Sequence, residues 1–98
     1  MALDQESAIQ QRIAEVAQYQ QNINLYTAIA SALPSEWPDH LRHLKGASNK
    51  HAAIADLEDL DDVALVSDLW AHDEAVAAIR TETVEMRKAQ AILNALQA

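Results

Sequence analysis

Histidines are the side chains whose spacing comes nearest to that of a metal site. His40 and His43 lie three residues apart, His51 follows a short distance along the chain, and Glu36 lies four residues before His40. Zinc accepts imidazoles and carboxylates as ligands. The chain, however, contains neither H-E-x-x-H nor the E-x-x-H pair of di-iron bundles, and it has no Cys. We therefore expect these histidines to be structural or solvent-facing, with no metal and no cofactor.

The sequence also contains no pattern typical of nucleophilic catalysis. The five Ser and four His residues show no spacing that marks a nucleophile and its base. The single Gly, Gly46, is too few for a phosphate-binding loop or a nucleophile elbow, each of which needs at least two. His72 falls in an apolar row and is expected to be a core or interface residue. We predict that the protein is not an enzyme.

Acidic side chains are concentrated in one stretch. Residues 56–74 hold eight Asp and Glu residues and no Lys or Arg, while the whole chain carries a formal net charge of -8. Arg42, Lys45 and Lys50 lie just upstream. Dense like charge favours a docking surface for a basic protein partner, with Trp70 either as its projecting apolar anchor or as the edge of the core. The predicted partner-binding residues are Asp59, Asp61, Asp62, Asp68, Trp70, Asp73 and Glu74. Two other interpretations are a solvated helix start and pairing of the acidic and basic patches across a symmetric dimer.

The excess of acidic over basic residues also restricts which classes of partner the protein can bind. Direct binding to nucleic acid or to an anionic membrane needs clustered Lys and Arg, so we expect neither. The predicted function is a non-catalytic interaction module, such as a small adaptor or complex subunit. The alternative is an acidic inhibitor that imitates nucleic acid and blocks a basic site on another protein. The N-terminal residues do not resemble a signal peptide, so we expect a soluble, cytoplasmic protein.

The first third of the chain carries an apolar pattern that repeats every seven residues. Its two rows are Ile9, Val16, Ile23 and Ala30, and Arg12, Tyr19, Tyr26 and Leu33. This heptad pattern predicts a helix over about 4–32. Pro34 ends it, because the residue before a proline is pushed out of the helical region.

A second heptad row runs through the last third, at Leu65, His72, Ile79, Met86 and Leu93. Toward the C-terminus, Ala89, Ile92 and Leu96 supply a neighbouring apolar stripe. The pattern predicts a long helix over about 59–97, with Asp59 or Asp61 as its N-cap. Residues 33–58 should hold short helices and turns, with Ser35 and Ser48 as caps and Gly46 closing the first short helix.

These elements predict one all-α domain over residues 1–98, an antiparallel hairpin of two long helices with one or two short helices between them. Alanine occupies 20 of the 98 positions and Phe is absent, so a single hairpin has few large side chains to bury. We therefore predict a homodimer in the form of a four-helix bundle. The predicted self-association residues are Ile9, Val16, Tyr19, Ile23, Tyr26, Ile79, Met86 and Leu93.

Overall fold

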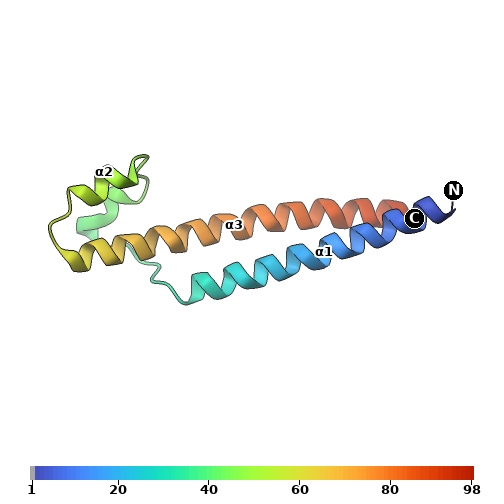
Figure 1. Ribbon diagram of the computed structural model, residues 1–98, viewed down its shortest axis with the longest axis horizontal. Helices are drawn as coiled ribbons and strands as arrows, with labels where there is room; N and C mark the ends of the chain where they lie inside the picture. The colour runs from blue at the N-terminus through green and yellow to red at the C-terminus, as the bar shows by residue number, and fades with distance from the viewer. Residues whose placement is uncertain (1) are drawn as a thin grey trace.

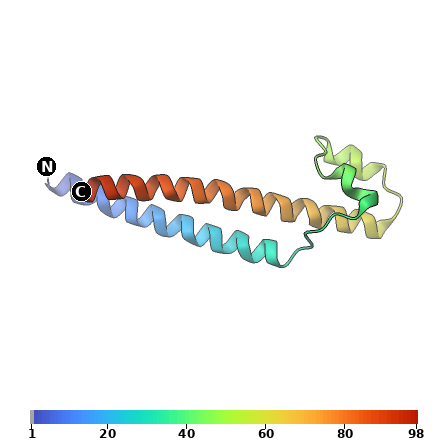
Figure 2. The same ribbon diagram turned by 180° about the vertical axis from the view of Figure 1, so that it is seen from behind.

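The protein is a long helical hairpin with a small helical head at one end. The computed structural model describes the backbone of residues 2–98 and the side chains from Asp4 onward. The elements are α1 (Ala2–Ser31), the 3-10 helix η1 (Asp39–Leu44), α2 (Lys50–Ala55) and α3 (Leu60–Gln97). α1 and α3 run antiparallel, and η1 and α2 lie against the beginning of α3 (Figures 1 and 2). The predicted all-α hairpin with short helices between the long ones is confirmed.

The shape is elongated. The described residues extend over 65 × 23 × 17 Å, and their radius of gyration is 19.5 Å. A compact domain of about 100 residues has a radius of gyration of about 13 Å. We call residues 34–74 the head, and residues 2–33 together with 75–97 the stalk. Both chain ends lie at the end of the stalk that is far from the head (Figure 1).

Capping side chains set where the helices of the head begin. Asp59 is the N-cap of α3, and its carboxylate accepts a hydrogen bond from the backbone N–H of Asp61 at 2.8 Å. This confirms one of the two predicted caps. Asp61 and Asp62 follow in the first turn, where negative charge complements the helix dipole.

The predicted caps of the short helices are wrong. η1 begins after Pro38 with no capping side chain, and α2 is capped by Asn49, whose side chain accepts from the N–H of Ala52 at 3.0 Å. Asn and Ser are equally good caps, so the sequence could not separate Asn49 from its neighbour Ser48. Gly46 directly follows Lys45, the C-cap of η1, so the predicted end of the first short helix is confirmed, although the φ angle of Gly46 is not positive.

The most deeply buried core of the described residues lies in the head. It joins η1 and the segment before it to the first turns of α3, through Trp37, Leu41, Leu44, Val66, Leu69 and Trp70. Both indole N–H groups are satisfied: Trp70 donates to the Leu44 carbonyl at 2.9 Å, and Trp37 donates to Asp73 Oδ2 at 3.2 Å. The two Trp residues thus supply the large apolar area that the Ala-rich chain otherwise lacks.

The stalk is packed less deeply. No α1 side chain from Asp4 onward is fully buried, although α3 buries Ala75, Ala89 and Leu93 against it. Two hydrogen bonds show the antiparallel register, from Gln5 Nε2 to the Leu96 carbonyl at 2.8 Å and from Asn22 Nδ2 to Glu82 Oε2 at 3.2 Å. A pair of helices has no third element to close the seam, so its residues stay half-exposed.

Candidate interaction surfaces

Trp70 lies in the core of the head and does not project from the surface. Its side chain is 6% exposed, its N–H is bonded to the Leu44 carbonyl, and Lys50 Nζ lies 5.4 Å from the ring centroid. The expectation that Trp70 is a projecting partner anchor is therefore wrong. Asp68, two residues earlier in α3, lies on another face of the helix and is exposed, while the indole packs against η1.

Three of the predicted partner-binding acids already have partners within the chain. His40 Nε2 lies 3.1 Å from Asp62, Lys50 pairs with Glu74, and Asp73 accepts from Trp37 and lies 3.1 Å from His72 Nδ1. The positively charged and histidine side chains come mainly from η1 and α2. The basic and acidic patches therefore meet at these points inside one chain.

The remaining predicted acids lie on the surface of the head. Asp61 and Asp68 are exposed, and their carboxylates form no ion pair within the described part of the chain, while Asp59 is occupied as a cap. Leu60 stands between Asp59 and Asp61 and is 83% exposed. Leu60, Asp61 and Asp68, with Asp56 and Glu58 before them, form what we call the acidic tip.

Sequence reasoning missed Leu60 because it belongs to neither heptad row. The available signal was its position directly after the N-cap of α3. A first-turn residue at the very end of a helix has neighbours on one side only, so an apolar residue there is easily left without a packing partner.

The predicted self-association residues line the seam between α1 and α3. Leu93 is buried, and the other seven are half-buried. The large apolar side chains that remain exposed on the stalk are different ones: Ile13, Leu25, Ile29, Val84 and Ile92. The residues of the heptad rows thus pack mainly between α1 and α3. Packing against another molecule has to involve the exposed apolar residues beside these rows.

Leu25 and Ile29 lie one helical turn apart on α1, so they face the same way. Ile29 and Tyr26 line a groove of about 320 Å³ with Ala71, Ala75 and Ala78 of α3, and Glu74, which pairs with Lys50, lies at its edge. Small residues on α3 keep this groove open and let another helix approach closely. We call Leu25, Ile29 and this groove the stalk groove.

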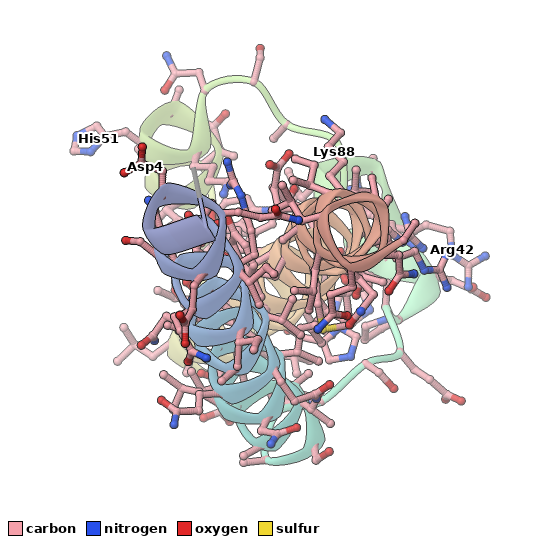
Figure 3. The ribbon with its side chains drawn as sticks, turned by 90° about the vertical axis from the view of Figure 1, so that its right-hand side faces the viewer. Asp4, Arg42, His51 and Lys88 are labelled. Carbon is pink, nitrogen blue, oxygen red and sulfur yellow. The ribbon has the colours of Figure 1, made fainter. Side chains whose placement is uncertain are left out.

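The histidines are not assembled into a metal site. Among the described residues, no group of three His, Cys, Asp or Glu side chains lies close enough to hold a metal ion. Figure 3, which looks along the stalk from the end with the termini, shows His51 and Arg42 pointing outward on opposite sides of the head. His72 is half-buried beside Asp73.

No helix in the described part of the chain has an apolar stretch long enough to cross a bilayer. Comparisons with protein-family models, curated proteins and solved structures find no match for this chain. The arguments that follow therefore start from the geometry of the head and the stalk.

Proposed function

We propose that the protein is a non-catalytic interaction module whose stalk packs against the stalk of a second copy to form a four-helix bundle. The observation that carries this proposal is the incomplete burial of the apolar side chains of α1. It is a helix of 30 residues with an apolar heptad pattern, yet none of its side chains from Asp4 onward is fully buried. Large half-exposed apolar rows are the usual surface of a helix that packs on further helices.

The stalk groove is the contact surface that we propose. Leu25 is 58% exposed, and Ile29, which lines the groove beside the alanines of α3, is 40% exposed. A second hairpin that runs antiparallel lays the far end of its stalk, where Ile92 is exposed, against this groove, and the twofold axis repeats the same contact at the other end. The contact would cover the half-exposed seam residues from the side that the hairpin leaves open.

Charge favours a second copy as the occupant and an antiparallel arrangement of the two hairpins. The head contains ten acidic and three basic residues, whereas the stalk contains five acidic and four basic residues. Two nearly neutral stalks can pack without strong repulsion. Two acidic heads repel each other when they lie together, and they are separated by several Debye lengths when they lie at opposite ends.

Sedimentation equilibrium tests the assembly. We expect a mass of twice 10.8 kDa at micromolar concentration. The double substitution Leu25→Glu and Ile29→Glu should give a folded monomer, because a buried unpaired carboxylate opposes association. The matched control is Gln20→Glu with Thr27→Glu, which adds the same charge at exposed positions on the opposite side of α1 and should remain dimeric. A wild-type monomer at millimolar concentration would contradict the proposal.

A spin-label distance tests the arrangement. The chain has no Cys, so His51→Cys gives one label on each head. Heads at opposite ends should give a distance on the order of 50 Å, because α3 alone is about 57 Å long. A distance below about 30 Å would mean parallel hairpins with adjacent heads.

The acidic tip supports a second contact, with a protein partner that has a basic surface around an apolar pocket. Leu60 would be the anchor, since it is the most exposed large apolar side chain among the described residues. Affinity capture should compare the wild type with Leu60→Ser and with Asp61→Asn plus Asp68→Asn. We expect one retained protein to be lost with both variants and kept with Glu6→Gln, a charge control on the stalk. Equal capture by all four chains would exclude the tip as a docking surface.

A further inference from the structure

A cavity lies where the chain crosses from α1 to the head. Its volume is about 400 Å³, within the range of small-molecule sites, and it is lined by Ser35, Lys45 and the face of α3 that carries His72, Val76 and Arg80. A second hollow of about 280 Å³ shares Ser35 and Lys45 with it and adds Arg42. Three of the seven Lys and Arg residues of the chain thus line two adjoining hollows.

Two of these cations have no internal counter-charge. Arg42 pairs with Asp39 at 2.9 Å, but Lys45 and Arg80 form no ion pair within the described residues. Acidic residues outnumber Lys and Arg by 15 to 7 in this chain, so carboxylates are not scarce. Lys45 and Arg80 nevertheless line the same cavity without an ion pair, although Asp73 lies in its wall and Glu36 lines the adjoining hollow.

The carboxylate in the cavity wall is already engaged. Asp73 Oδ2 accepts the Trp37 N–H at 3.2 Å, and Oδ1 lies 3.1 Å from His72 Nδ1. With its proton on Nδ1, His72 is oriented by Asp73. This carboxylate therefore helps to hold the wall of the cavity in place, and among the described residues it forms no ion pair with Lys45 or Arg80.

We propose that this cavity binds the phosphate group of a small phosphate monoester, held by Lys45 and Arg80 with the Ser35 hydroxyl. Two unpaired cations match the nearly double negative charge of a phosphate monoester near neutral pH. The Arg guanidinium can donate two parallel hydrogen bonds to phosphate oxygens, and Lys supplies a point charge. Val76 and Ala77 give the organic part of the ligand an apolar wall. The site does not depend on the self-association proposed above, because none of its residues belongs to the stalk groove.

Two-dimensional ¹H–¹⁵N NMR titration with phenyl phosphate tests the site. We expect saturable shifts centred on Ser35, Lys45, Arg80 and the indole N–H of Trp37, which is bonded to the cavity wall. Inorganic phosphate should shift the same signals with weaker affinity, and benzoate should be weaker still. Equal affinity for benzoate would replace the phosphate assignment with a general anion site.

Substitutions distinguish a specific phosphate site in the cavity from nonspecific attraction of the anion to any positively charged side chain. Arg80→Gln and Lys45→Gln should each weaken the binding of phenyl phosphate by about tenfold or more, since each removes charge-assisted hydrogen bonds. Arg87→Gln is the matched control, because Arg87 is also exposed on α3 without an ion pair but lies outside the cavity. Equal weakening by Arg80→Gln and Arg87→Gln, or shifts that never saturate, would overturn the proposal.

Discussion

The head and the stalk are both built from helices, but they bury their side chains to different depths. In the head, short elements with few repeating features enclose Leu41, Val66 and Leu69 almost completely. In the stalk, two long helices with regular heptad rows leave nearly all of their apolar residues half-exposed. Regular periodicity therefore marks which face of a helix is apolar. How deeply that face is buried depends on how many elements surround it.

The comparison also suggests different roles for the two regions, with the head contributing most to stability and the stalk providing the surface for assembly. A fully buried Leu side chain stabilises a fold by about 1.5–3 kcal/mol relative to an exposed one, so the small head is the better anchored region. The stalk leaves apolar area exposed, so it is the region that we propose to pack against a second copy.

The largest expected loss of stability comes from removing a large side chain from the core of the head. Leu69→Ala should lower the free energy of unfolding by about 2–5 kcal/mol, because Leu69 is fully buried between α3 and η1. The matched substitution Ile23→Ala, on the half-buried seam of the stalk, should cost less than half as much. Urea unfolding followed by far-UV circular dichroism measures both. Equal losses would remove the distinction between the two regions.

A smaller effect is expected from one hydrogen bond. Trp70→Phe keeps an aromatic ring in the head but removes the N–H that the Leu44 carbonyl accepts. Leaving that buried carbonyl without its partner should cost about 1–3 kcal/mol. The same urea experiment measures it, and an unchanged midpoint would mean that water replaces the indole N–H.

The concentration dependence of thermal unfolding should differ between the head and the stalk, and this can be tested without any substitution. Tryptophan fluorescence reports only on the head, whereas circular dichroism reports mainly on α1 and α3, with 30 and 38 residues. A tenfold increase in concentration favours a dimer by about 1.4 kcal/mol and should raise the midpoint of the dichroism melt by about 5 °C. The fluorescence midpoint should stay constant. If both midpoints ignore concentration, the stalk is stable without a second copy.

The smallest expected effect lies on the surface of the head. Lys50→Gln removes the ion pair with Glu74 and the contact of the ammonium with the Trp70 ring. Exposed ion pairs and exposed cation–π contacts each contribute up to about 1 kcal/mol, so we expect a loss of about 1 kcal/mol that shrinks at high salt. A larger, salt-independent loss would show that Lys50 acts by packing.

The long helices and the hairpin could be predicted because their signals are local. Heptad spacing marks α1 and α3, Pro34 ends the first of them, and Asp59 is a favoured cap at the start of the second. These features depend on the backbone and on residues within a few positions, so one sequence suffices to locate them.

The sequence could not decide whether Trp70 lies in the core or on the surface, because the answer depends on contacts between distant residues. The sequence places Trp70 beside Asp68, Asp73 and Glu74, which suggests an exposed ring. The decisive neighbour is the carbonyl of Leu44, which only the folded head brings to the indole. The same holds for Lys45 and Arg80, which are 35 positions apart in sequence and share one cavity.

The position of both chain ends beside each other, joined by the Gln5 contact to Leu96, determines how the protein responds to mechanical force. Force applied to the two ends pulls α1 and α3 apart at the open end of the stalk, so it loads one turn of the seam at a time. Each half-buried turn can yield separately, because local opening costs least where few apolar groups are buried. The stalk therefore unzips at low force, and the head carries the load only after α1 has come away.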